Sequence, residues 1–261
     1  GEGAVTGVTA RLLARGKEEG LEGVTFSPAV ERVGSGTLAP HVLGRVGAMS
    51  PEQWEELKRK GYAMEETVGK DGAEAAFEEA LHGTPGRRYV ETAGSGWDTE
   101  PVAGKNVTLT LDKDLQAAAQ DALQAFLDGH PNASGGAVVA LDVEDGGVLA
   151  MASLPGYDPE TFSKQYGALA QDEGHPLMNR AIQGLYAPGS AFKLVTATAG
   201  AKTGSAQVAG EEEANAVLVC FAPYDAPKIA LALVAEQGGS GAALGDAAAS
   251  ILNAWAAGNM S

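Results

Sequence analysis

The chain has 261 residues, of which 44% are apolar and only 6% are aromatic, so it can form one large domain or two ordinary ones around a core of Ala, Val and Leu. Its net charge of −16 argues against nucleic acid as a partner, because phosphate contacts need clustered Lys and Arg. Because Cys220 is the single cysteine, an internal disulfide is excluded. The sequence contains no run of about 18 apolar residues, so it predicts no membrane span.

Two helices are predicted before residue 84, after a polar and Gly-rich start. The first runs from Ser50 to Gly61, with Ser50 as N-cap and Gln53 completing a capping box. The second starts at Asp71, with Glu74 as its reciprocal cap. Its expected apolar stripe consists of Ala73, Phe77, Ala80 and Leu81.

The next predicted elements are a strand, a turn, and a further strand that leads into a helix. Arg87–Thr92 reads as a strand and Gly94–Gly96 as a turn. We place a domain boundary near Gly104, which divides the chain into residues 1–103 and 104–261. Asn106–Asp112 is predicted as a strand that leads into a helix capped by Asp112. The buried stripe of that helix is expected to be Leu115, Ala119, Leu123, Phe126 and Leu127.

The rest of the chain is rich in strand patterns. Gly136–Val143 and Val148–Leu154 are apolar strands, and Asp145-Gly146 between them is a strong hairpin signal. Ala216–Phe221 and Ile229–Val234 are predicted as two further strands. A last helix carries Leu244, Ala248, Ile251, Leu252 and Trp255 at helical spacing.

One stretch carries a pattern suited to nucleophilic chemistry. Pro188-Gly189 breaks the chain, and Ser190 starts a run of helix formers that ends at Gly200. Lys193 stands at i+3 from Ser190 and shares its helix face. A serine hydroxyl needs such a base to take its proton, and a helix N-terminus favours an oxyanion. The following Lys202–Ser205 offers a second cation, a hydroxyl and a glycine.

The Ser-x-x-Lys spacing alone has an ordinary structural explanation, namely an N-cap serine beside a solvated lysine, and a Lys-Thr-Gly triplet alone is equally unspecific. Their combination is more specific. Tyr186–Lys193, read Tyr-Ala-Pro-Gly-Ser-Ala-Phe-Lys, followed by Lys202–Gln207, read Lys-Thr-Gly-Ser-Ala-Gln, resembles the active-site serine and third-motif segments of penicillin-binding proteins. These serine transpeptidases cross-link peptidoglycan and are acylated by β-lactams.

Other segments extend the resemblance to class B penicillin-binding proteins. They are Leu38–Gly47, Val68–Gly83, Val107–Gln116 and Pro155–Phe162. The resemblance implies an α+β protein in which an N-terminal non-catalytic pedestal domain of the dimerisation type, residues 1–103, precedes a transpeptidase domain, residues 104–261. That second domain should hold a central antiparallel sheet flanked by helices, with its helical subdomain reduced or missing. We expect a structural role for His41.

The resemblance also implies a mechanism. Ser190 would attack the carbonyl of a D-Ala-D-Ala stem peptide, and Lys193 would accept its proton. The backbone N–H groups of Ser190 and Ser205 would form the oxyanion hole, and an amine from a second stem peptide would then take the acyl group. The implied substrate-binding residues are Lys202, Thr203 and Gly204. Neither a metal nor a cofactor is needed, since nucleophile and base are both side chains.

Two departures from the family stand out. The chain contains no Ser-x-Asn motif, and only Gly200 and Ala201 separate the serine helix from the Lys-Thr-Gly triplet. A helix over residues 190–199 would be roughly 13–14 Å long, whereas three extended steps from its end reach at most about 10–11 Å. Lys202 could not return beside Ser190 without strain. We therefore expect a missing segment at the 200/201 junction, or a minimal version of the domain.

The resemblance implies peptidoglycan stem peptides and β-lactam antibiotics as ligands, and other cell-wall synthesis proteins as partners through residues 1–103. It places the protein at the extracytoplasmic face of the bacterial cell membrane, with the anchor outside this chain, and leaves a role in cell shape or in cell division open. One alternative is a catalytically incomplete fragment that acts as a scaffold. A β-lactamase or β-lactam sensor is a third interpretation, against which the segments from Leu38 to Gly83 argue.

Overall fold

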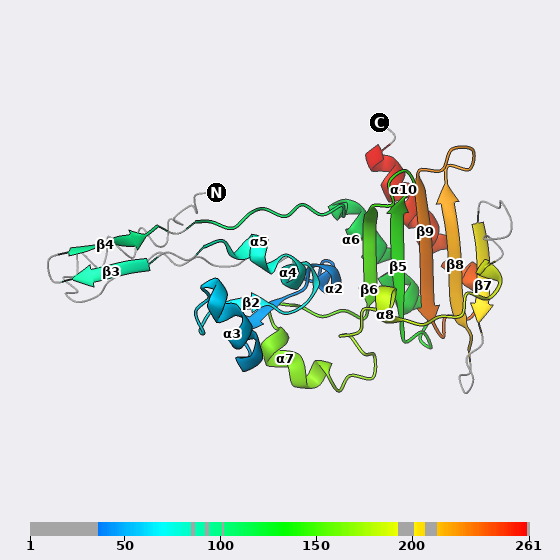
Figure 1. Ribbon diagram of the computed structural model, residues 1–261. Helices are drawn as coiled ribbons and strands as arrows, with labels where there is room; N and C mark the ends of the chain where they lie inside the picture. The colour runs from blue at the N-terminus through cyan, green and yellow to red at the C-terminus, as the bar shows by residue number, and fades with distance from the viewer. Residues whose placement is uncertain are drawn as a thin grey trace, which may run out of the picture. The chain divides into compact units, whose positions relative to one another are not determined.

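The computed structural model describes residues 36–84, 87–91, 94–100, 102–192, 201–206 and 213–259, and gives the backbone alone for 87–91, 94–99, 192 and 201–206. At its centre is a five-stranded sheet in the order β6-β5-β9-β8-β7, in which every neighbouring pair is antiparallel (Figure 1). The strands are β5 Gly135–Asp142, β6 Val148–Leu154, β7 Ala201–Ala206, β8 Asn215–Ala222 and β9 Ile229–Glu236. The predicted antiparallel sheet is thus confirmed.

One face of the sheet is covered by two helices, α6 (Lys113–Gly129) and α10 (Gly245–Asn259), which pack against each other as well (Figure 1). Asp112 caps α6 by accepting hydrogen bonds from two backbone N–H groups, both at 2.9 Å, which confirms the predicted cap. The buried core between helices and sheet includes Leu123, Val138, Leu233 and Ile251. Small residues on the strands let the two helices lie close to the sheet.

The opposite face of the sheet carries a second, smaller apolar cluster. Ala137, Val217 and Val234 project there from three strands and meet Ala191 of the 3-10 turn η2 (Gly189–Phe192). Side chains alternate between the faces along each strand, so neighbours of these residues join the helix-covered core instead. Helix α8 (Arg180–Gln183) contacts β5 and β6. This second face is therefore the one that meets the segment around Ser190.

The part of the chain before α6 is made of short elements. Strands β1 and β2 pair antiparallel, as do β3 and β4. Ser50 accepts a hydrogen bond from Gln53 N while the Gln53 side chain accepts from Ser50 N, so the predicted capping box is confirmed. The elements are α2 Pro40–Leu43, β1 Val46–Ala48, α3 Pro51–Leu57, η1 Lys58–Lys60, β2 Thr67–Gly69, α4 Gly72–Ala76, α5 Glu78–His82, β3 Arg87–Glu91 and β4 Gly94–Thr99.

The second predicted helix is interrupted. It divides into α4 and α5 at Phe77, whose φ of −113° and ψ of 18° leave the helical region. The expected apolar stripe is not buried, since Phe77 is 42% and Leu81 is 36% exposed. Asp71 stands at the N-cap but makes no cap hydrogen bond, because its carboxylate accepts from Arg45 N at 2.9 Å and pairs with Arg45 Nε at 3.1 Å.

Two further predictions near the expected domain boundary are wrong. Gly94–Gly96 belongs to β4 and pairs with β3 instead of forming the turn. Residues 106–112 form no strand. They contact the neighbouring strand β6 through hydrogen bonds from Thr110 Oγ1 to Val148 O at 2.7 Å and from Asp112 N to Leu149 O at 2.9 Å, which do not make a ladder.

The remaining elements are α7 Phe162–Leu169 and η3 Gly241–Leu244. The Asp145-Gly146 hairpin is confirmed, with Gly146 at a φ of 76° that favours glycine. Cys220 is buried in the core. In the portion of the chain described above, no helix is both long and apolar enough to cross a membrane.

We expect Leu123→Ala to lower the free energy of unfolding by about 2–5 kcal/mol, because it empties a fully buried site between α6 and the sheet. Leu185→Ala is the matched control, since Leu185 is 98% exposed and should change stability by less than about 0.5 kcal/mol. Urea unfolding followed by circular dichroism measures both. Equal losses in the two variants would contradict the assigned core.

Candidate active site

Ser190 lies in a short turn held against the sheet. Gly189 has a φ of 52°, in the left-handed region, which accounts for the glycine before the serine. Pro188 O accepts a hydrogen bond from Ala191 N at 3.0 Å and closes the turn. Ala191 is only 4% exposed and packs into the second apolar cluster with Val217 and Val234. Ser190 itself is half-buried beside this anchor.

The turn with Ser190 and the strand with the Lys-Thr-Gly triplet lie against each other. η2 contacts both β7 and β8, and β7 pairs with β8 so that Lys202 stands opposite Val219 and Thr203 opposite Leu218. β7 is the last strand of the sheet on this side in the described residues. The fold therefore brings together two motifs that the sequence analysis joined by resemblance alone.

Several predicted site groups lie outside the described residues. Lys193 and residues 194–200 are among them, as are the side chains of Lys202, Thr203 and Ser205. The described start of the predicted serine helix, Gly189–Phe192, is a 3-10 turn and not an α-helix. The missing segment at the 200/201 junction was inferred from an α-helix over Ser190–Ala199, so this segment stays a prediction, as do the roles of the individual site residues.

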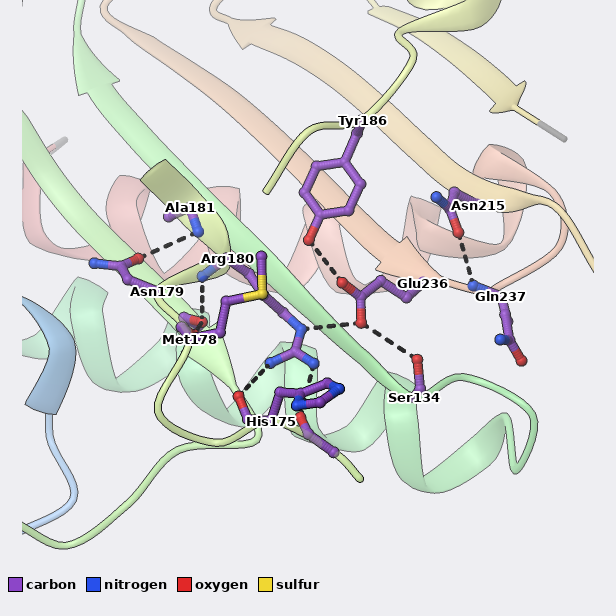
Figure 2. Close-up of polar contacts among 12 residues, drawn as sticks. Ser134, His175, Met178, Asn179, Arg180, Ala181, Tyr186, Asn215, Glu236 and Gln237 are labelled. Carbon is purple, nitrogen blue, oxygen red and sulfur yellow. Dashed lines mark hydrogen bonds and ion pairs between the residues drawn. The ribbon is translucent and has the colours of Figure 1, made fainter. Parts of the chain in front are cut away.

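A polar network that was not predicted from the sequence centres on Glu236 and includes Tyr186, which stands four residues before Ser190 in the chain (Figure 2). Glu236, the last residue of β9, accepts hydrogen bonds from Tyr186 Oη at 2.8 Å, Arg180 Nε at 3.0 Å and Ser134 Oγ at 3.2 Å. Burial, reinforced by the Glu236 hydrogen bond, raises the pKa of the Tyr186 phenol, so the hydroxyl stays protonated and donates. A carboxylate ending an otherwise apolar strand was the available sequence signal.

Arg180 is the buried centre of this network. Its side chain is 2% exposed, and besides Glu236 it donates from its two terminal nitrogens to His175 O at 3.2 Å and to Gly174 O at 2.7 Å. Its backbone N–H donates to Ser153 Oγ at 2.9 Å. A buried guanidinium needs a charged partner and several acceptors to offset its lost hydration, and this site supplies both.

His41 also contacts the loop whose carbonyl groups accept hydrogen bonds from Arg180. His41 Nε2 lies 2.7 Å from Pro176 O, and its ring meets the Tyr157 ring edge-on with centroids 5.1 Å apart. Burial lowers the pKa of His41, and the positive charge of Arg180 lowers it further, against the opposing effects of the Pro176 carbonyl and Asp71.

Among the described residues, no group of three or more His, Cys, Asp and Glu side chains could hold a metal ion.

Comparison with known sequences gives two family matches. The model described as Penicillin-binding Protein dimerisation domain matches residues 5–109. The model described as Penicillin binding protein transpeptidase domain matches residues 136–201. The second match contains Ser190 and Lys193 and ends at the first residue of β7.

Among curated proteins, the chain is 38% identical over 189 residues to peptidoglycan D,D-transpeptidase MrdA of Salmonella typhimurium strain SL1344, which covers 66% of this chain and 29% of that protein. It is 34% identical over 176 residues to MrdA of Acinetobacter baumannii, covering 63% of this chain and 25% of that protein. The chain thus spans less than a third of the length of these relatives.

Among solved structures, Pseudomonas aeruginosa PBP2 in complex with WCK 5153 superimposes with a TM-score of 0.69 at 19% identity, covering 84% of this chain and 89% of that one. PBP2 from Helicobacter pylori in complex with MreC gives a TM-score of 0.67 at 18% identity, covering 84% and 77%. At these identities the likeness concerns the fold.

We expect the wild-type protein to lose stability relative to His41→Gln as the pH falls below about 6.5. The pKa of His41 is lowered by folding, so the unfolded chain binds the proton more readily and acid favours unfolding. The loss should be complete once the pH is below the lowered pKa, whereas the His41→Gln variant has no proton to gain at this position. Urea unfolding at pH 7.5 and pH 5 measures the difference, and an equal pH response in both proteins would contradict it.

Proposed function

The chain belongs to the class B penicillin-binding protein family, and we propose that it serves as a peptidoglycan D,D-transpeptidase that cross-links stem peptides and is acylated by β-lactams. The observation that carries this proposal is the contact between η2, which bears Ser190, and β7, which bears the Lys-Thr-Gly triplet. The names of the relatives and the transpeptidase-domain match over residues 136–201 support it.

In the proposed reaction, Ser190 Oγ attacks the carbonyl between the two D-Ala residues of a stem peptide. Lys193 accepts the hydroxyl proton, and the terminal D-Ala leaves as its amine takes up a proton. The ester formed on Ser190 is then attacked by an amine of a second stem peptide, which restores the hydroxyl. Backbone N–H groups of Ser190 and Ser205 would stabilise the negative charge on the carbonyl oxygen in both steps.

Strand β7 suits the binding of an extended peptide. It pairs with β8 on one side, and no described strand pairs with its other side. A substrate peptide can add to such an edge through backbone hydrogen bonds. Lys202 and Thr203 would then bind the terminal carboxylate, and Gly204 would let the substrate approach the backbone. In the proposed mechanism the chemistry needs no metal or cofactor.

We further propose that residues 1–103 bind other cell-wall synthesis proteins, and that the protein works at the extracytoplasmic face of the bacterial membrane. The dimerisation-domain match over residues 5–109 supports the first point. A solved complex of Helicobacter pylori PBP2 with MreC shows that a protein of similar fold assembles with another protein.

We also propose that a segment belongs between Gly200 and Ala201. The transpeptidase-domain match stops at residue 201, and the chain has no Ser-x-Asn motif. A chain without this segment keeps the nucleophile and the Lys-Thr-Gly strand but lacks a hydrogen-bonding wall of the cleft. Proton delivery to the leaving amine would be slowed most, because the missing motif would face the serine.

We expect the protein to form one covalent adduct with benzylpenicillin, and Ser190→Ala to abolish it. The serine ester is the family's acyl-enzyme, so the mass should rise by one whole penicillin without loss of a leaving group. Intact-mass spectrometry measures the adduct. Ser163→Ala is the matched control, since Ser163 is an exposed serine in α7 and its loss should leave the adduct unchanged.

Other outcomes of this experiment would favour the other functions. A well-folded chain that forms no adduct would favour a scaffold that binds partners through residues 1–103. Release of hydrolysed penicillin with many turnovers per chain would favour a β-lactamase. An adduct that persists in Ser190→Ala would show that another nucleophile reacts.

The proposed segment at the 200/201 junction has its own test. We expect a tryptic map of the protein purified from its native source to contain additional residues. These residues should lie between Gly200 and Ala201. The mass of the chain as printed is 26.5 kDa. A native protein whose tryptic peptides join Gly200 directly to Ala201 would refute the proposed segment.

A further inference from the structure

The stretch that leads to Ser190 is largely exposed. Between the end of α8 at Gln183 and the start of η2 at Gly189 the chain has no regular structure. Leu185 is 98% exposed, and Ala187 and Pro188 are exposed as well. Tyr186 is the exception, because its ring packs on the second apolar cluster and its hydroxyl reaches Glu236. In this described stretch, Tyr186 is thus the side chain that fastens the approach to the serine.

The partner of Tyr186 is itself fixed in position. Glu236 ends the central strand β9 and uses one carboxylate oxygen for Tyr186 and the other for Arg180 and Ser134 (Figure 2). Arg180 is locked in turn by the carbonyls of Gly174 and His175. Hydrogen bonds that involve a charged group are the stronger ones in proteins, so the Tyr186 hydroxyl is tied to a rigid support.

Two glycines make room for this arrangement. A Cβ atom at Gly135 would lie 2.5 Å from Arg180 Nε, and one at Gly184 would lie 2.3 Å from Cε2 of Tyr186. Gly184 has a φ of −67°, so its backbone conformation suits any residue and only space requires the glycine. The sequence therefore accommodates both the guanidinium and the phenol ring at close quarters.

We propose that Tyr186, held by the Glu236–Arg180 pair, is a positioning residue that fixes the turn bearing Ser190. The proposal rests on the proposed function and names a further residue of the same site. Ser190 is pinned on both sides, by Tyr186 four residues before it and by buried Ala191 directly after it. Without the hydroxyl contact, the side-chain anchors of the turn among the described residues would be reduced to Ala191 and the tyrosine ring.

The expected consequence is kinetic. A nucleophile reacts fast only when its oxygen is held near the attack position, and small displacements reduce the rate strongly. Loss of the Tyr186 hydroxyl keeps the ring packed but frees the turn to move. The rate constant of acylation should therefore fall while initial binding of the antibiotic, which depends on β7, is kept.

The test compares Tyr186→Phe with wild type, with Tyr224→Phe as matched control. Tyr224 is 67% exposed and lies in the β8–β9 connection, at the opposite end of β9 from Glu236. Acylation by a chromogenic β-lactam at rising concentration separates the dissociation constant from the rate constant. We expect the rate constant of Tyr186→Phe to fall about tenfold, with a dissociation constant within about twofold of wild type, and no change in Tyr224→Phe.

A second measurement does not depend on catalysis. Hydrogen–deuterium exchange of the peptide covering residues 184–192 should be faster in Tyr186→Phe than in wild type and unchanged in Tyr224→Phe. An unaltered acylation rate, or a slower one with unaltered exchange, would overturn the positioning role while leaving the proposed function intact. If the wild-type protein is not acylated, but hydrogen exchange is faster in Tyr186→Phe than in wild type, the proposed function would be overturned. The positioning role of Tyr186 would then be supported.

Discussion

The alternation of side chains across the five-stranded sheet is the constraint on which the rest of the structure depends. One set of positions, including Val138, Leu218 and Leu233, is buried against α6 and α10. The other set, Ala137, Val217 and Val234, receives Ala191 and the ring of Tyr186. A shift of one residue in strand register would exchange the two faces. The hydrophobic core therefore also determines where the turn bearing Ser190 can lie.

Small residues make this two-sided use of the sheet feasible. Ala140, Ala150 and Ala152 are fully or almost fully buried under the helices, where larger side chains would push α6 away. On the other face, Gly135 leaves space for the guanidinium of Arg180. The abundance of Ala and Gly in the composition thus has a definite purpose, since it permits close approach where aromatic side chains are few.

Local signals in the sequence were sufficient for much of the fold. The capping box at Ser50, the cap at Asp112 and the Asp145-Gly146 hairpin each involve residues within a few positions of one another, and all three are confirmed. The failures have a different origin. Phe77 looked like a core residue from its spacing, but whether an apolar face is buried depends on what packs against it. Asp71 was a good N-cap in sequence, yet Arg45 takes its carboxylate.

The candidate active site likewise has one part that the sequence predicted and one part that it did not. The two motifs were recognisable because each is contiguous in sequence, and the placement of η2 against β7 agrees with their joint interpretation. The network around Glu236 could not be predicted, because Arg180 and Glu236 are 56 residues apart and Tyr186 and Glu236 are 50 apart. A charged residue at the end of an apolar strand signals that a partner exists but does not identify it.

These long-range contacts also join the early part of the chain to the site. Ala39 N donates to Gln120 Oε1 at 2.8 Å, and His41 bonds to Pro176 O in the loop whose neighbouring carbonyls bind Arg180. A continuous set of contacts therefore runs from residues 39–41 through this loop to Arg180, and from there through Glu236 to Tyr186. Continuity alone does not transmit a signal, since coupling needs an element with two arrangements. It does mean that the support of the Ser190 turn extends beyond the transpeptidase match, into residues matched by the dimerisation-domain model.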